Sequence, residues 1–217
     1  MKLPSLIICH SQEAYLKGLV HGIEDLEVSI LNSTTNGVRA LRWILREKPD
    51  FVIIEAQFEE LSAYEIIKEV TLKKLKTKFI LIFPNANYRD VILARSLKIA
   101  GCFYAGESLD AIQNCVTTVL EGKVCFSRSI SKVQIADKAL HNLDLLSDAE
   151  INVLMLINVY KSSAKIAEKL SSSVRTIDKH RSNIINKLGI QKETHSLMHW
   201  ALQHNEIIKT LAFQKIS

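Results

Sequence analysis

The hydrophobic pattern of the first 120 residues alternates between short apolar runs and longer amphipathic stretches. The apolar runs predict strands at residues 5–9, 26–31, 51–54, 78–83 and 102–105. The amphipathic stretches predict helices at residues 15–23, 37–46, 62–72, 88–98 and 108–120. This alternation indicates an α/β domain, a five-stranded parallel sheet with helices on both faces. The active crevice of such a sheet lies beyond the carboxyl ends of its strands.

The pattern changes after residue 127. Residues 128–142 are polar and carry no strong turn signature, so they are predicted to form a linker. Helical patterns resume at Leu146, where Ser147 and Glu150 have the spacing of a capping box. The predicted organisation is an α/β domain at 1–127, the linker at 128–142, a small all-α domain at 143–208 and a tail at 209–217.

Within the all-α domain, two short helical patterns are separated by a polar turn at residues 171–173, the outline of a helix-turn-helix. The second helix places apolar residues at 174, 177, 184, 185 and 188, which lie on one side at 3.6 residues per turn. Ser173 suits its N-cap and Gly189 suits the left-handed position after its last residue. The opposite side carries groups that can pair with phosphates and base edges.

Charge is unevenly distributed along the chain. Residues 169–192 contain six basic residues and one acidic residue, Asp178, whereas residues 1–127 contain fifteen of each. The basic surplus therefore lies where contacts to nucleic-acid phosphates would use it. From charge alone, a solvated basic helix face is an equal alternative.

The segment from Leu146 to about Ile207 resembles the LuxR-type helix-turn-helix of the NarL/FixJ response-regulator family. The residues that carry the resemblance are Leu146, Ser147, Glu150, Val153, Leu154, Lys165, Ile166, Ala167, Leu170, Ser173, Thr176, Ile177, His180, Arg181, Asn183, Ile184, Lys187, Leu188, Gly189 and Ile190. The resemblance implies sequence-specific binding of double-stranded DNA by a homodimer, with the second helix of the motif in the major groove. Two positions depart from the family: Asp178 replaces a common lysine, and Tyr160 replaces a turn glycine.

The predicted DNA-binding residues lie on and just after the second helix of the motif. They are Arg175, Thr176, Asp178, Lys179, Arg181, Ser182, Asn183, Asn186, Lys187 and Lys192. Lys179, Ser182 and Asp178 are assigned to base edges, and the remaining cations to phosphates. A last amphipathic helix at 193–203 carries Leu197, Trp200 and Ala201. In isolation this stripe is typical of a core, but the resemblance implies that its outer part forms the dimer contact.

The first 127 residues resemble the flavodoxin-like receiver domain of response regulators, through Gly18, Leu19, residues 49–54, Ala100, Gly101, Ala111, Ile112 and residues 120–122. The family's reactive positions are changed. His10 and Ser11 replace the acidic pair that holds magnesium, and Glu55 replaces the phosphorylated aspartate. Phe83, or Pro84, replaces the hydroxyl residue, and Glu107, or Ser108, replaces the lysine. Phosphoryl transfer needs a metal ion and cationic groups, so a degenerate receiver that is not controlled by aspartyl phosphorylation is predicted.

Other chemistry at this crevice is less well supported. Glu55 could imitate a phosphorylated aspartate, but the groups that would read its charge are missing, which favours a plain carboxylate at a strand end. His10 and Glu55 lack a third metal ligand. Cys9 and His10 cannot form a nucleophile–base pair because successive strand side chains point to opposite faces. No enzyme activity, metal or cofactor is predicted, and a ligand pocket in place of the phosphorylation site stays open.

Composition sets the remaining bounds. The chain has 217 residues, 47% hydrophobic and 24% charged, with no run long enough for a membrane span and no secretion signal. A cytoplasmic protein without membrane contact is expected, and its four cysteines form no CxxC pair. The prediction is a DNA-binding transcriptional regulator. The alternative is a module that regulates another transcription factor, with a protein partner on the receiver-like half and little DNA binding.

Overall fold

The computed structural model describes residues 2–58, 60–85, 90–92, 94, 97, 99–132, 138–190 and 197–216. The chain divides into two compact units, Met1–Val133 and Gln134–Ser217. Each unit has its own buried core, so each is described separately.

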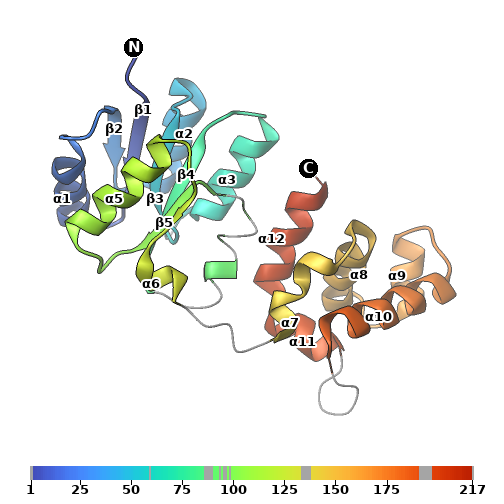
Figure 1. The fold of residues 1–217 in the computed structure, drawn as a ribbon. Coiled ribbons are helices and arrows are strands. Elements are labelled where there is room, and N and C mark those ends of the chain that lie inside the picture. The colour runs from blue at the N-terminus through green and yellow to red at the C-terminus, as the bar shows by residue number, and fades with distance from the viewer. Residues whose placement is uncertain are drawn as a thin grey trace. The chain divides into compact units, whose positions relative to one another are not determined.

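The first unit contains one parallel sheet with the strand order β2-β1-β3-β4-β5-β6 (Figure 1). The strands are β1 Ser5–Cys9, β2 Ser29–Thr34, β3 Phe51–Glu55, β4 Lys78–Phe83, β5 Gly101–Tyr104 and β6 Cys125–Phe126. The α/β fold is confirmed, but the sheet has six strands instead of five. The sixth, β6, has only two residues, which is too short for a periodic pattern to reveal.

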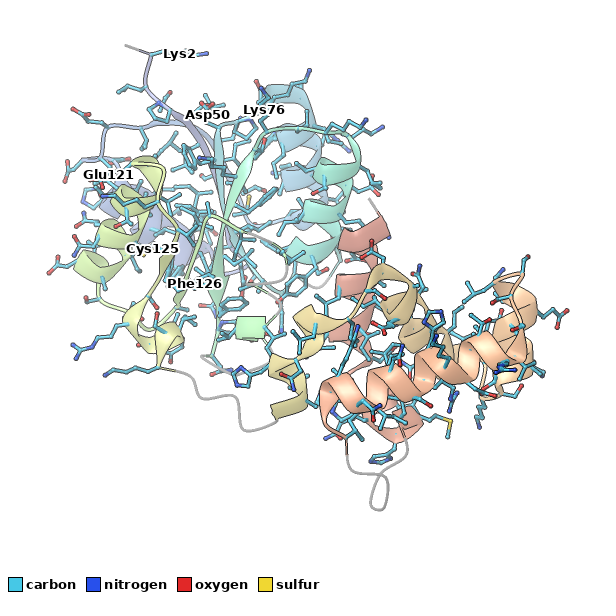
Figure 2. The ribbon with its side chains drawn as sticks, turned by 45° about the vertical axis from the view of Figure 1, so that its right-hand side comes forward. Lys2, Asp50, Lys76, Glu121, Cys125 and Phe126 are labelled. Atoms are coloured by element: carbon cyan, nitrogen blue, oxygen red, sulfur yellow. The ribbon has the colours of Figure 1, made fainter. Side chains whose placement is uncertain are left out.

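The start of the sheet is fixed by one carboxylate. Asp50, which Figure 2 labels, lies at the entrance to β3. Its Oδ2 accepts hydrogen bonds from the backbone nitrogen of Ser5 at 2.8 Å and from the Ser5 hydroxyl at 2.7 Å. These bonds lower the pKa of Asp50. They tie the first residue of β1 to the strand beside it and so help to set the register, in which Leu6 lies opposite Phe51.

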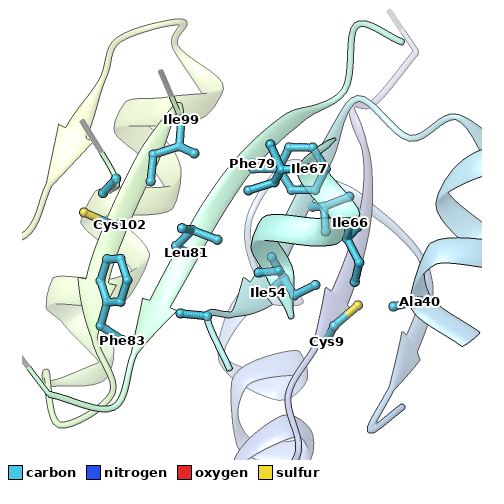
Figure 3. Close-up of a cluster of buried hydrophobic side chains, with 14 of the residues drawn as sticks. Cys9, Ala40, Ile54, Ile66, Ile67, Phe79, Leu81, Phe83, Ile99 and Cys102 are labelled. Carbon is cyan, nitrogen blue, oxygen red and sulfur yellow. The ribbon is translucent and has the colours of Figure 1, made fainter. Parts of the chain in front are cut away.

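Helices cover both faces of this sheet. Helices α1 Glu13–Ile23 and α5 Leu109–Leu120 cover one face, and α2 Gly37–Glu47 and α3 Ala63–Leu72 cover the other (Figure 1). Side chains alternate between the two cores, so that Ile7 and Cys9 face α2 and α3 while Leu6 and Ile8 face α1 and α5. Figure 3 shows the cluster on the α2 and α3 side, which includes Cys9, Ile54, Phe83 and Cys102.

Two predicted segments differ from the structure, and a third is only partly described. The second strand begins at Ser29 instead of residue 26, because its position is set by pairing with β1. Residues 128–142 are not a plain linker: α6 Arg128–Ser131 buries Ile130 in the first core, and α7 Lys138–His141 carries the buried Ala139 and Leu140. The helix predicted at 88–98 falls largely outside the described residues, although residues 90–92 and 94 are helical.

In its described residues, 138–190 and 197–216, the second unit forms helices and no strand. It contains a short 3-10 helix Leu143–Leu145, α8 Asp148–Val159, α9 Ser163–Lys169, α10 Val174–Leu188, α11 Leu197–Gln203 and α12 Asn205–Ile216. α8 lies at its centre and packs against α10, α11 and α12 (Figure 1). Residues 209–217 were expected to form a tail, but most of them belong to α12, which buries Leu211 and Ala212. None of the helices in the described ranges is long and apolar enough to cross a membrane.

We expect Gly101→Ala to destabilise the first unit by about 1–3 kcal/mol, because the added carbon would overpack the core. It would lie 2.9 Å from Val119 Cγ2 and 3.0 Å from the carbonyl oxygen of Cys125. Native-state hydrogen exchange of the β5 amides measures the effect in the intact chain.

Gly18→Ala is the matched control. An added carbon at Gly18 meets no atom within 4 Å, and the residue lies inside α1. We therefore expect this change to stabilise the unit by about 0.5–1 kcal/mol. Shifts of the same sign in both variants would mean that close packing is not what requires glycine at 101.

Candidate nucleic-acid interface and receiver-like pocket

Helix α10 begins and ends where its sequence predicts. Ser173 Oγ accepts a hydrogen bond from the backbone nitrogen of Thr176 at 3.1 Å, which satisfies an otherwise unpaired donor of the first turn. Gly189 follows the last turn in the left-handed conformation, with φ of 69°, and its backbone nitrogen donates to the carbonyl of Ile185. Both ends of the helix, and so the length of its polar face, are therefore set by Ser173 and Gly189.

The apolar side of α10 fixes its rotation. Ile177, Ile184 and Leu188 are at most 1% exposed, and the helix packs against α8 and α9. Turning α10 about its axis would bring these side chains into water, so its polar side is held outward.

The structure places most of the predicted DNA-binding residues on this polar side. Six of them are exposed and three are half-buried. The exposed residues are Arg175, Thr176, Asp178, Lys179, Ser182 and Asn186, and the half-buried ones are Arg181, Asn183 and Lys187. Lys192 lies outside the described residues.

Lys187 does not have the free ammonium group that was expected. Its Nζ lies 2.7 Å from Oε2 of Glu150 on α8, and the Glu150 side chain is only 4% exposed. The same oxygen accepts the backbone N–H and the hydroxyl of Ser147, which completes a capping box. Burial raises the pKa of Glu150, but the lysine and serine contacts outweigh it and lower the pKa. Lys187 therefore joins α10 to α8. Counting charges along the chain could not reveal that Glu150 is its partner.

The residues predicted for the dimer contact belong to the core instead. Leu197, Trp200 and Ala201 are between 0% and 6% exposed, since α11 packs against α8 and α12. The Trp200 ring also contacts the His204 ring, with centroids 4.7 Å apart. The residues that α11 exposes are His199, Leu202 and Gln203.

The receiver-like pocket lies at the carboxyl ends of β1 and β3 and is held by direct hydrogen bonds. Glu55 Oε2 accepts the backbone N–H of Ser11 at 2.8 Å. His10 is buried, and its ring stacks on Tyr15 with centroids 4.1 Å apart. Burial, together with the charge of Glu55, raises the pKa of Tyr15 to about 12.

His10 is neutral in this arrangement. The backbone N–H of Gln12 donates to His10 Nδ1 at 3.1 Å, so this nitrogen carries no proton of its own. Nδ1 also lies 3.8 Å from Glu55 Oε2, but both atoms are acceptors and do not form an ion pair. Burial lowers the pKa of His10, and the nearby charge of Glu55 only partly opposes this effect.

The other two pocket positions point to different surroundings. Phe83 is fully buried in the core on the α2 and α3 side and carries no hydroxyl. Glu107 Oε1 accepts the backbone N–H of Ser129 in α6, at 3.4 Å. Burial raises the pKa of Glu107, but hydrogen bonds from Ser127 and Ser129, at the start of α6, outweigh this effect and lower the pKa. His10, Ser11 and Glu55 therefore lie together, whereas Glu107 is bonded to α6.

A crevice of about 320 Å³ adjoins Ser11. Its lining residues are Ser11, Thr35, Asn36, Gly37, Gln57, Phe58 and Glu60. Of these residues, only Ser11 was assigned to the pocket from the sequence. Asn36 could have been recognised from sequence only as a polar residue directly before the helix predicted at 37–46. Within the described parts of the chain, no three His, Cys, Asp or Glu side chains are grouped to hold a metal ion.

Comparison with known proteins agrees with both units. Residues 144–200 match the model of the family described as bacterial regulatory proteins, luxR family. The response regulator protein VraR of Staphylococcus epidermidis is 24% identical over 186 residues, 85% of this chain and 88% of VraR. The transcriptional regulatory protein MctR of Rhizobium johnstonii is 26% identical over 196 residues, 89% of each chain.

A solved structure of the RcsB response regulator of Salmonella typhimurium shares this fold. It is 19% identical, with a TM-score of 0.58, and the alignment covers 94% of this chain and 100% of that one. The two chains share the architecture of a parallel α/β unit followed by a helical unit. Residues 144–200 match the luxR family of bacterial regulatory proteins, and the chain is similar over most of its length to the response regulator VraR and the transcriptional regulatory protein MctR.

We expect Lys187→Met to destabilise the second unit by about 1–3 kcal/mol, because it leaves the Glu150 carboxylate without its cation. The loss should be full above the ordinary glutamate pKa of about 4.3 and should shrink as pH falls through the lowered pKa of folded Glu150. At the lowest pH, Glu150 is protonated in the original protein and in the Lys187→Met variant alike, so the ion pair no longer makes their stabilities differ. Hydrogen exchange of α8 amides, followed against pH, measures the difference.

Lys179→Met makes the same change on the exposed side of α10 and should alter stability by no more than about 0.5 kcal/mol. An equal, pH-independent loss in both variants would show that the Glu150 pair does not stabilise the unit.

Proposed function

We propose that this protein is a transcriptional regulator that binds double-stranded DNA in a sequence-specific manner. The observation that carries the proposal is the exposed polar side of α10, with Arg175, Lys179 and Ser182, held outward by a buried apolar side. This helix lies inside the segment that matches the luxR family. RcsB, whose fold is similar, has been solved in a complex with DNA.

The exposed residues suggest how the DNA is read. Lys179 and Ser182 donate hydrogen bonds to base edges in the major groove, and Asp178 accepts one from a cytosine amino group. Arg175 and Arg181 contact phosphates, whereas Lys187 is held by Glu150. A homodimer reads two half-sites about one helical turn apart. Its contact includes exposed residues of α11 such as Leu202, which is 51% exposed, in place of the buried stripe.

We further propose that aspartyl phosphorylation does not control this protein, which acts in the cytoplasm. Support comes from the pocket, where the carboxylate of Glu55 accepts a hydrogen bond from the backbone of Ser11, and Nδ1 of the neighbouring His10 accepts one from the backbone of Gln12 and so carries no proton. Glu107, at the position where receivers carry a lysine, is a carboxylate that accepts a hydrogen bond from α6 and so offers no cation. A phosphoryl group at Glu55 would therefore meet no cation from the four positions that carry this chemistry in receivers.

A second candidate function is regulation of another transcription factor through the receiver-like unit. Two observations favour it: Asp178 is exposed on the reading face, and Lys187 is paired inside the unit. A salt titration separates the two functions. Binding to DNA weakens steeply as salt rises because counterions are released, whereas a protein complex responds less.

Lys179→Ala should weaken binding to the preferred DNA site by about 1–3 kcal/mol, because it removes a base-edge donor. The site comes first from selection of bound fragments out of a random DNA pool. Fluorescence anisotropy at fixed salt then gives the affinity. Lys209→Ala is the control, since Lys209 lies on α12 and pairs with Glu206. Equal affinity of the Lys179→Ala and Lys209→Ala proteins would contradict the assignment of Lys179 to a base edge.

Incubation with acetyl phosphate and magnesium should leave the protein unlabelled, because the pocket lacks the metal-binding acids and the cation that phosphoryl transfer requires. Intact-mass spectrometry detects an added phosphoryl group directly. A response regulator that takes up phosphate from acetyl phosphate, treated in parallel, tests whether the phosphodonor is active. A stable phosphoryl group on Glu55 would overturn the proposed independence from phosphorylation.

A further inference from the structure

Three cysteines meet at one edge of the first unit. Cys102 lies on β5, Cys115 on α5 and Cys125 on the edge strand β6, and all three are free thiols. Cys115 Sγ lies 3.5 Å from the carbonyl oxygen of Cys125 and 3.9 Å from that of Cys102. One thiol therefore sits against the backbone of the two neighbouring strands.

The sheet register shows which two thiols face each other. Gly101 pairs with Cys125 across β5 and β6, and a carbon added at Gly101 would lie 3.6 Å from Cys115 Sγ. The missing side chain at Gly101 thus leaves the space beside Cys125 to the Cys115 thiol. Cys115 is buried in the core on the α1 and α5 side, and the partly buried Cys125 packs against the same core.

Cys102 faces away from this pair. Its side chain belongs to the core on the α2 and α3 side, where Figure 3 shows it near Phe83 and Ile99. Cys9 lies in that same core and is fully buried. Only Cys125 is partly exposed, and Figure 2 shows it on β6 with Phe126. An oxidant in solution therefore reaches Cys125 first.

We propose that Cys115 and Cys125 form a reversible disulfide when the protein meets a hydroperoxide. In the first step, Cys125 sulfur attacks one peroxide oxygen and the O–O bond breaks. The other oxygen leaves with the thiol proton as an alcohol, or as water when the oxidant is hydrogen peroxide, and Cys125 becomes a sulfenic acid. In the second step, Cys115 sulfur attacks the sulfenic sulfur, the S–O bond breaks, and the departing hydroxide takes the Cys115 proton as water. The two sulfurs together lose two electrons, which reduce the peroxide.

Burial raises the pKa of the Cys115 thiol, so its reactive thiolate is scarce. The product joins the edge strand β6 to α5 across a separation of ten residues. Because α6 begins at Arg128, directly after this strand, the cross-link fixes the part of the fold from which the chain leaves the first unit.

Peroxide treatment of the full-length protein, followed by thiol counting after denaturation and by non-reduced peptide mapping, tests the site. We expect the count to fall from four thiols to two, the mass to fall by two hydrogen atoms, and one linked peptide pair to contain Cys115 and Cys125. Dithiothreitol should restore all four thiols.

Variants separate this pair from the other cysteines. Cys125→Ser should abolish the cross-link, whereas Cys115→Ala should leave a sulfenic acid at Cys125 that dimedone traps. Cys9→Ala and Cys102→Ala are the matched controls and should still form the link. Three outcomes would each overturn the proposal. They are a link between Cys102 and Cys125, oxidation of Cys125 beyond sulfenic acid while Cys115 stays free, and four unreacted thiols in the folded protein under conditions that oxidise the denatured protein.

Discussion

The packing of α10 on α8 is the constraint on which the rest of the second unit depends. Burial of Ile177, Ile184 and Leu188 contributes about 1.5–3 kcal/mol for each side chain, as an upper estimate. Glu150 adds to this by capping its own helix and pairing with Lys187 on α10 through a single oxygen. One buried carboxylate thus couples the start of α8 to the last turn of α10. Together with the buried apolar side, this contact fixes the rotation of α10 so that its polar side faces the solvent.

The first unit uses its carboxylates in a related way. Asp50, Glu55 and Glu107 each accept backbone N–H groups from a neighbouring segment: the start of β1, the loop after β1 and the start of α6. In a metal-dependent phosphorylation site, carboxylates near the strand ends are left available to a cation. Here Glu55 and Glu107 instead connect parts of the fold, which supports a role for this unit that does not require phosphoryl chemistry.

Sequence patterns predicted the elements that local signals determine. β3, β4 and α10 were found because continuous apolar runs, helical spacing and end residues such as Ser173 and Gly189 act over a few positions. The second strand was misplaced because Ser29–Thr34 is largely polar and its position depends on β1. Lys187 was assigned wrongly because its partner, Glu150, lies on another helix. Trp200 was assigned wrongly because neighbouring helices bury α11 on the side that carries it. An exposed cation and a paired cation look the same in a sequence.

The proposed DNA reading rests on less positive charge than the sequence suggested. Lys187 is held by Glu150, and Asp178 offsets one of the remaining cations on the exposed side of α10. Each phosphate contact contributes to affinity through the release of counterions, so fewer contacts mean a smaller share of affinity that is independent of sequence. Discrimination between DNA sites depends on base-edge contacts, which pairing of two subunits doubles. A weakly charged reading helix therefore shifts the balance from general attraction to DNA toward selection of a site.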